Sequence, residues 1–453
     1  MPVTYIPSQL EAPPSTAAPA LALRASPSWL LFSDLKLVLK LAKLIPHIFL
    51  PFPRGHHRWL PFRCGSRVDA NNAGRYDEVA PTYGNVHDVA LHVTLLGLTA
   101  TAFAVAARNL PAATGATMAA YAAGCGLALL LLCKPLNYGP RVLHSSVDLS
   151  AFTARPRERW IFVNGICAGT RWLQENLNMI ATVFGRPVMG VHNRTYGIIL
   201  DLIECLVQRD FGYMTADIRI AHNAIKATLL DPTVDRVVLL AHSQGGIIIS
   251  AALDALSYAD LPVEAWDKLE IYTFGCAANH FSNPPRCVCR HPAGSPGPKQ
   301  PPRHPRILRQ IAVIEHYANE RDFVARMGVL NLAGKPAANL APAAPAATTT
   351  PPLIGGGGGS FVGKVFMRIG TGGHLFCQHY LGPMFSGLRP EFLDEVVVTD
   401  DESAAAVGTA SGAQDAERLP ADTGVSWAAL PVAQRTVREV SRLRKYKDGK
   451  VPQ

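Results

Sequence analysis

The sequence predicts an α/β protein with a doubly wound, mostly parallel sheet, preceded by a helical hairpin that can cross a membrane. Short β-branched and aliphatic runs alternate with helical patterns over residues 156–390, and repeated strand–helix units give parallel strands with right-handed crossovers. Two long apolar stretches, 89–107 and 112–133, precede this region. Only 17% of the 453 residues are charged and 48% are hydrophobic, which favours a membrane-embedded part.

The expected strands are short runs rich in Val, Ile, Leu and aromatic residues, as in strands buried on both faces: 159–165, 187–193, 236–241, 268–275, 309–318 and 363–370. Helical patterns lie between them, among them 170–185 and 245–256, and a closing helix is expected at 374–385. Two segments interrupt the alternation. The Pro/Arg/His-rich insertion 282–306 and the low-complexity insertion 333–360 lack the residues to bury a core.

The two apolar stretches predict a transmembrane hairpin within residues 86–135, because only "RNLP" (108–111) separates them. Each stretch, 89–107 and 112–133, can cover roughly 30 Å of hydrocarbon as a helix. A pair of Ala-rich helices buried in protein is the alternative. Basic residues flank the outer ends of the hairpin, whereas the turn holds only Arg108, so the rest of the chain is expected on the cytosolic side.

The two ends of the chain differ from its centre. Residues 1–27 are rich in Pro, Ala and Ser and are expected to be disordered. Residues 28–51 predict an apolar helix that ends or kinks at Pro46 and lies either on a membrane surface or against the globular domain. Three lysines form a stripe along it: Lys36, Lys40 and Lys43. Residues 391–453 are expected to be a mostly disordered tail with a short, solvated basic helix at 435–450.

Charge and cysteine content narrow the range of partners. The net charge is +9, from 43 Lys and Arg against 34 Asp and Glu, but the basic residues do not alternate with aromatic ones. A membrane bilayer is therefore the expected partner, and a nucleic acid is not. The nine cysteines show no pairing pattern, which fits free thiols in a reducing compartment. The single C-x-C at Cys287 and Cys289 has no second pair to complete a zinc site.

The stretch "AHSQGG" (241–246) is the strongest indication of chemistry. It lies between a buried strand and a helix, and small residues, Ala241 and Gly245, bracket its serine. A tight strand-to-helix turn holds its central residue in a strained conformation and exposes the hydroxyl at the carboxyl end of the sheet. We interpret Ser243 as the nucleophile of a G-x-S-x-G-type elbow with Ala in the first small position. An ordinary βα turn is the alternative.

The partners of such a serine follow it in the order acid, then histidine. Asp322 comes directly after a predicted strand and is the expected acid, with Glu320 able to substitute. A turn-forming or helix-capping role is the alternative for Asp322. Only His374 and His379 follow in the sequence. Glycines precede His374 on the loop that leaves the last strand, so His374 is the expected base and His379 the second choice.

The oxyanion of an ester-hydrolysis intermediate requires N–H donors. Gln244, directly after the nucleophile, is expected to supply one backbone N–H. The turn "NGICAG" (164–169) is expected to supply the other, from Ile166 or Cys167. His242, directly before the nucleophile, is expected to pack behind it rather than take its proton.

The blocks "AHSQGG", "IYTFGCAANHF" and "NERDFVARMG" resemble those of class 3-type lipases in the α/β-hydrolase superfamily, over about residues 156–390. The sequence departs from them in its two insertions, in Ala241 for glycine and in Ala325 for a usual proline. "VHNRTYGIILDLIECL" (191–206) also resembles uncharacterised membrane-linked hydrolases of fungi and other organisms. The resemblance implies the α/β-hydrolase fold and hydrolysis of esters, often acylglycerols or phospholipids, without a metal or organic cofactor.

The sequence thus predicts a membrane-anchored serine hydrolase that cleaves a lipid or other carboxylic ester through an acyl-enzyme. A thioesterase or amidase with the same triad is one alternative. The other is a membrane-tethered interaction protein that has the fold without the chemistry. A non-catalytic protein is expected to lose at least one triad group, whereas this chain retains all three: Ser243, Asp322 and His374.

Overall fold

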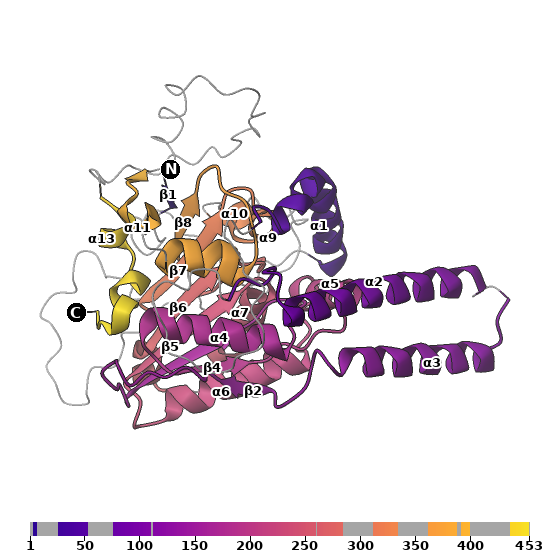
Figure 1. The fold of residues 1–453 in the computed structure, drawn as a ribbon, viewed down its shortest axis with the longest axis horizontal. Helices are drawn as coiled ribbons and strands as arrows, with labels where there is room; N and C mark the ends of the chain where they lie inside the picture. The colour runs from indigo at the N-terminus through magenta and orange to yellow at the C-terminus, as the bar shows by residue number, and fades with distance from the viewer. Residues whose placement is uncertain are drawn as a thin grey trace, which may run out of the picture.

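The structure is a computed structural model that describes residues 3–6, 26–52, 76–109, 112–259, 261–283, 311–333, 361–386, 391–398 and 435–452. The strands are β1 Val3–Ile6, β2 Val142–His144, β3 Glu158–Val163, β4 Val188–Val191, β5 Arg236–His242, β6 Leu269–Phe274, β7 Val313–Asn319, β8 Lys364–Arg368 and β9 Val397–Val398. Within the described residues they form one nine-stranded sheet in the order β2-β4-β3-β5-β6-β7-β8-β1-β9 (Figure 1).

The six inner strands of this sheet, β4, β3, β5, β6, β7 and β8, run parallel. They correspond to the six strands predicted from the sequence, so the expectation of a mostly parallel α/β sheet is confirmed. The sequence did not predict β1, β2 and β9, which have two to four residues each. β2 and β1 pair antiparallel with β4 and β8, and β9 pairs parallel with β1.

Helices cover both faces of the sheet (Figure 1). Beyond the N-terminal region they are α4 Thr170–Phe184, α5 Ile198–Arg209, α6 Ala216–Leu230, α7 Gln244–Ser257, α8 Val263–Asp267, α9 Phe323–Met327, α10 Val329–Leu332 and the π-helix η3 Phe376–Ser386. One face packs an aliphatic core on α6 and α7, with Ile225 and Ile248 fully buried. The other packs an aromatic core on α4 and η3, where Trp160, Phe274 and Tyr380 are buried.

Two long helices, α2 Tyr83–Asn109 and α3 Gly115–Cys133, form a hairpin that projects from the sheet domain (Figure 1). Both are long and apolar enough to cross a membrane, with a mean hydropathy of 1.9 in each. Only 11% and 6% of their apolar windows are buried, so they are not core helices of the domain. At its base, α2 is fixed to α4: Arg171 donates to Asp88 at 2.9 Å and Trp172 donates to Asn85 at 3.0 Å.

The expectation that residues 1–27 are disordered is wrong for residues 3–6. These residues form β1, and Val3 and Tyr5 are buried, with the Tyr5 ring 5.4 Å from that of Phe366 on β8. A four-residue strand in a Pro/Ala/Ser-rich stretch has no detectable periodicity, and its partner strand lies more than 350 residues away. Residues 7–25 lie outside the described part, as do residues 284–310 and 334–360, which include most of the two predicted insertions.

The helix predicted at 28–51 is divided into α1 Pro27–Leu41 and the 3₁₀-helix η1 Ala42–Ile48, which contains Pro46. α1 packs on the sheet domain through a buried ion pair in which Arg209 donates to Asp34 at 2.7 Å. Arg209, at the end of α5, also donates to the carbonyls of Ala277 and Met327. A fully buried arginine thus holds α1 against the loops at the carboxyl edge of the sheet.

The expectation of a solvated basic helix at 435–450 is also wrong. The C-terminal clamp, residues 435–452, contains α13 Val437–Val440 and the 3₁₀-helix η4 Leu443–Gly449, and its apolar side chains Val437, Leu443 and Tyr446 are fully buried. Residues 391–398 contain α11 Glu391–Asp394 and β9, so this part of the tail is ordered as well. Arg442 of the clamp binds Glu270, a carboxylate of the sheet, and this contact cannot be seen from the tail's own sequence.

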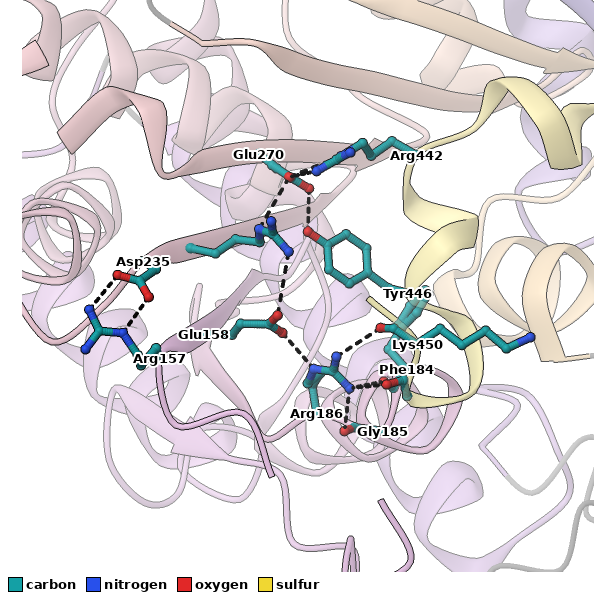
Figure 2. Close-up of polar contacts among 12 residues, drawn as sticks. Arg157, Glu158, Phe184, Gly185, Arg186, Asp235, Glu270, Arg442, Tyr446 and Lys450 are labelled. Carbon is teal, nitrogen blue, oxygen red and sulfur yellow. Dashed lines mark hydrogen bonds and ion pairs between the residues drawn. The ribbon is translucent and has the colours of Figure 1, made fainter. Parts of the chain in front are cut away.

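Glu270 of β6 is the main carboxylate that the clamp binds (Figure 2). It accepts from Arg442 at 2.8 Å and from the Tyr446 hydroxyl at 2.7 Å. Arg186, also fully buried, donates to Glu158 at 2.8 Å and to the carbonyl of Lys450 at 3.0 Å. These contacts tie the chain end to the amino edge of the parallel strands, opposite the elbow.

Candidate active site

Ser243 lies in the sharp turn between β5 and α7. Its backbone has φ 57° and ψ −123°, a strained conformation for a residue with a side chain. The turn is tightly packed, because a Cβ atom at Gly245 would collide with the carbonyl of Val163 and one at Gly165 would lie 2.5 Å from Ser243 Cβ. Only glycine fits at these two positions. The turn therefore has the geometry of a nucleophile elbow.

Asp322 and His374 form a buried hydrogen-bonded pair. Asp322 lies between β7 and α9, and His374 lies on the loop between β8 and η3. His374 Nδ1 lies 2.8 Å from Asp322 Oδ2, and Asp322 is fully buried. A carboxylate only accepts hydrogen bonds, so Nδ1 is the donor, and in the neutral ring Nε2 is then the nitrogen with a lone pair. The pair has the orientation that a serine hydrolase requires of its base and acid.

The Asp322–His374 pair and the Ser243 elbow both lie next to Gly275. The carbonyl of Phe274 accepts from Ser243 N at 3.0 Å, and the next residue, Gly275, faces the pair. A Cβ atom at Gly275 would lie 3.0 Å from His374 Nδ1 and 2.9 Å from Asp322 Oδ2. Within the described residues, His374 Nε2 is buried and has no hydrogen-bond partner, Ser243 Oγ included. Base-to-nucleophile bonds often form only in the substrate complex.

His242 supports the base from behind. Its Nε2 lies 2.7 Å from the backbone carbonyl of His374, and the two imidazole rings are 4.7 Å apart. Burial, and then the electrostatic effect of the neighbouring His374, lowers the pKa of His242 well below its usual value, so its ring is neutral. Because a carbonyl only accepts, Nε2–H is the donor. His242 thus positions the His374 loop, in accord with the expectation that it packs behind the serine.

Tyr380 is a partner of Asp322 that the sequence analysis missed. Its hydroxyl donates to Asp322 Oδ2 at 2.5 Å, the same oxygen that binds His374. Asp322 Oδ1 accepts from Val324 N at 2.8 Å, so this residue also caps α9. Both roles considered for Asp322, acid and helix cap, are therefore combined in one side chain. In the sequence, the only indication of this role was that Tyr380 follows His374 by six residues.

The two second choices lie elsewhere. His379 Nδ1 accepts from Leu375 N at 3.0 Å and its Nε2 lies 2.8 Å from the carbonyl of Pro51, so both ring nitrogens are engaged. Burial lowers the pKa of His379 to about 4. Glu320 accepts from Gly370 N at 2.6 Å and pairs with Arg326 at 3.5 Å. His379 holds the base loop to the N-terminal segment, which is a structural role.

Gln244 begins α7, and its side chain is held in a buried amide network. Asn193 donates to Gln244 Oε1 at 2.5 Å, and Gln244 Nε2 donates to Gln208 Oε1 at 3.0 Å. Asn164, at the start of the opposite loop, accepts from Asn193 N at 2.8 Å. The network fixes the backbones on both sides of the serine. This preorganisation is what an oxyanion site needs, because donors must be in place before charge develops.

One of the two alternatives for the second oxyanion donor is wrong. The N–H of Cys167 donates to Asp201 Oδ2 at 2.9 Å and is therefore already engaged. Asp201 also accepts from the Thr195 hydroxyl and from Tyr196 N, both at 2.7 Å. Asp201 thus shapes the loop after β3. Ile166 stays the predicted second donor.

Glu78 connects the segment before the helical hairpin to the base loop. Its carboxylate accepts from Cys377 N at 2.8 Å and from Gln378 N at 3.1 Å, at the start of η3. Burial raises the pKa of Glu78 to about 7. The residue lies five positions before α2, so the segment that enters the hairpin also caps the helix that follows His374.

Comparisons of the chain with protein-family models, with curated proteins and with solved structures each found no match. The function is therefore inferred from the residues and geometry of the site.

Proposed function

We propose that the chain is a membrane-anchored serine hydrolase that cleaves carboxylic esters, with Ser243 as nucleophile, His374 as base and Asp322 as the orienting acid. The observation that carries the proposal is the meeting of a strained serine elbow and a buried Asp–His pair at Gly275. Chance seldom joins these features, because the residues come from three separate strand ends. The position of the elbow at the carboxyl edge of a parallel sheet supports the α/β-hydrolase fold.

In the proposed reaction, Ser243 Oγ attacks the ester carbonyl carbon and its proton passes to His374 Nε2. Asp322 stabilises the imidazolium that forms. The carbonyl oxygen becomes an oxyanion, held by the backbone N–H groups of Gln244 and Ile166. When the tetrahedral intermediate collapses, the alcohol leaves with the proton from Nε2, and an acyl-enzyme remains. Water then attacks the acyl group by the same route, which restores the serine and releases the acid.

The apolar hairpin supports a lipid ester as substrate, because it would keep the site close to a bilayer. We also propose that α2 and α3 span the membrane with the sheet domain on the cytosolic side. The distribution of basic residues around the hairpin supports this orientation. Protease treatment of sealed, right-side-out and inverted vesicles tests it: the sheet domain should be cleaved only when the cytosolic side faces outward.

Pre-steady-state kinetics with a chromogenic short-chain ester test the catalytic proposal. We expect a burst of alcohol close to one equivalent of enzyme, because acylation should outpace deacylation. Ser243→Ala should abolish the burst, and its melting temperature should stay near that of the native protein. A folded protein that hydrolyses no oxygen ester, thioester or amide would contradict the proposal and favour the non-catalytic interaction protein. Preference for a thioester or amide would keep the triad and change the substrate class.

A further inference from the structure

Within the part of the chain that the structure describes, α1 and η1 leave one side of their surface uncovered, and that side is apolar. We call this surface the N-terminal platform; its exposed side chains are Leu31, Phe32, Leu35, Leu39, Ile45, Phe49 and Phe52. The opposite side of α1 carries the buried residues Asp34 and Leu41 and packs on the sheet domain. One face of the helix thus packs on the domain, as one of the two alternatives from the sequence expects, and the other face leaves the membrane-surface alternative as a prediction.

Basic residues accompany the exposed apolar side chains. Lys36 and Lys40 are exposed on α1, and Lys43 is exposed on η1. An apolar surface flanked by lysines matches the polar headgroup region of a bilayer that contains anionic lipids, with aliphatic contacts below and ammonium–phosphate contacts above. A protein partner would need polar groups to match these charges at fixed positions, whereas lipid headgroups adjust.

The position of the platform relative to the hairpin favours the same occupant. α1 lies on the side of the domain from which the hairpin projects, and it runs across the direction of α2 and α3 (Figure 1). A helix that lies flat on a bilayer has this orientation relative to helices that cross it. α5 links the two regions, because its start packs against α2 and its last residue, Arg209, binds Asp34 of α1. Exposed apolar side chains continue along this link: Leu202, Ile203, Phe211 and Tyr213.

The platform also contacts the base loop directly. The carbonyl of Ile48, at the end of η1, accepts from His374 N at 3.0 Å. The carbonyl of Pro51 accepts from Gln378 at 2.9 Å and from His379 at 2.8 Å. The backbone that follows the exposed helix therefore holds the loop that carries the base.

We propose that the N-terminal platform docks on the surface of an anionic bilayer, the same bilayer that holds the hairpin. The docking does not depend on the hydrolase activity. Its consequence for substrate does rest on the proposed function: the ester would come from the leaflet that the platform contacts, and it would reach Ser243 between the platform and the base of the hairpin.

Photo-crosslinking in the full-length protein tests the docking. A Ser243→Ala background keeps the lipid intact, and the protein is reconstituted in vesicles of phosphatidylcholine with tritiated phosphatidylserine. Leu39→p-benzoylphenylalanine, at a position that is 70% exposed, should yield a lipid adduct, as should Leu130→p-benzoylphenylalanine in α3. Tyr258→p-benzoylphenylalanine is the control. Tyr258 is 88% exposed but ends α7, at the edge of the sheet opposite the elbow, and should yield none.

An adduct at positions 39 and 130 without one at 258 supports the docking. The docking proposal is overturned by an adduct at position 130 alone, by the absence of an adduct at both 39 and 130, or by equal adducts at all three positions. The combined variant Lys36→Glu, Lys40→Glu and Lys43→Glu should reduce the adduct at position 39 several-fold, whereas arginine at the same three positions should retain it. Equal adduct yields for the two combined variants would contradict the choice of an anionic surface.

A paired activity assay tests the consequence for substrate. The double variant Leu35→Glu and Leu39→Glu should lose most turnover of a vesicle-embedded diacyl lipid and retain its turnover of a soluble short-chain ester. Equal losses on both substrates would show that the platform acts only on folding, and no loss on the vesicle would show that the ester arrives by another route. If the native protein hydrolyses neither substrate, the proposed function fails while the docking result stands.

Discussion

The two edges of the parallel sheet are organised in opposite ways. At the amino edge, the charged groups are paired: Glu270 binds Arg442 and Tyr446 of the C-terminal clamp, and Arg186 binds Glu158 (Figure 2). At the carboxyl edge, a serine is held in a strained conformation and the base has a buried nitrogen without a partner in the described residues. Matched polar groups stabilise a fold, whereas strain and an open acceptor are features that a reaction can use.

The contrast shows where to look for function in a sheet of this kind. Both edges contain buried ionisable groups, so burial of charge alone does not mark the site. The distinction is whether the hydrogen-bonding capacity of the group is already used. Glu315 at the amino edge has a raised pKa through burial, yet it accepts from Arg442 N at 2.8 Å and from the Tyr317 hydroxyl at 2.8 Å.

The largest effect should come from removing the base at the carboxyl edge. His374→Ala should lower kcat/KM for a soluble ester by about 10⁴–10⁶-fold, the scale of losing a triad member. His379→Ala is the matched control, since it should cost mainly stability, about 1–3 kcal/mol, through its lost buried hydrogen bonds. Steady-state kinetics and chemical denaturation measure the two effects. If His379→Ala is inactive at unchanged stability while His374→Ala stays active, then His379 and not His374 is the base.

The amino edge should respond in the opposite sense. Glu270→Ala should lower the free energy of unfolding by about 1–3 kcal/mol, because it leaves the buried Tyr446 and the partly exposed Arg442 without their acceptor. The activity per folded molecule should not change. Arg157→Ala is the control: its ion pair with Asp235 is more than half exposed on both sides (59% and 62%), and its loss should cost less than about 1 kcal/mol. Loss of activity in folded Glu270→Ala would contradict the view that the amino edge acts only on stability.

Stability should also depend on pH through Glu78. Its folded pKa of about 7 lies above its ordinary value of 4.5, so the folded state holds a proton that the unfolded state releases. Stability is therefore lost as the pH rises from about 4.5 to about 7, by up to about 1.4 kcal/mol per pH unit from this group. Glu78→Gln carries no charge and should show a flatter curve.

Denaturation of both proteins between pH 5 and pH 8 measures the difference. Burial also raises the pKa of Glu204 and Asp210 to about 7, but both residues are present in both proteins, so the difference isolates Glu78. Parallel curves would contradict the raised pKa.

The smallest expected effect concerns the hydrogen bond from Tyr380 to the acid, Asp322. Tyr380→Phe removes the second hydrogen bond to Asp322 Oδ2 and should lower kcat/KM by about tenfold, the scale of one hydrogen bond to a charged group. Tyr272→Phe is the matched control, because its hydroxyl binds Glu270 at the other edge. It should alter stability and leave kcat/KM unchanged. Equal kinetics for the two variants would remove Tyr380 from the description of the site.

The parts of the fold that the sequence predicts are those with a local pattern. The six parallel strands are largely buried, so each contains several neighbouring apolar residues, and the elbow stands between such a strand and a helix. β1 and the C-terminal clamp have no such pattern. Their stability comes from partners far along the chain, such as Phe366 for Tyr5 and Glu270 for Arg442. A basic tail segment is the same in sequence whether it is solvated or paired.

The candidate site follows the same division. Chain order and strand ends pointed to Ser243, Asp322 and His374, and the structure places the last two in contact beside the elbow. The supporting contacts could not be predicted, because each depends on a packed geometry: Tyr380 on Asp322, and His242 on the backbone of His374. The Cys167 alternative failed for a similar reason, since its N–H is bound by Asp201 from a separate helix.

Covalent labelling tests whether Ser243 is the activated nucleophile. The full-length protein in detergent is treated with a fluorophosphonate, digested, and mapped by mass spectrometry. One major adduct is expected, on Ser243, and it should be lost in Ser243→Ala and strongly reduced in folded His374→Ala. Labelling of another serine that persists in folded Ser243→Ala, or no labelling of a folded native protein, would contradict this assignment.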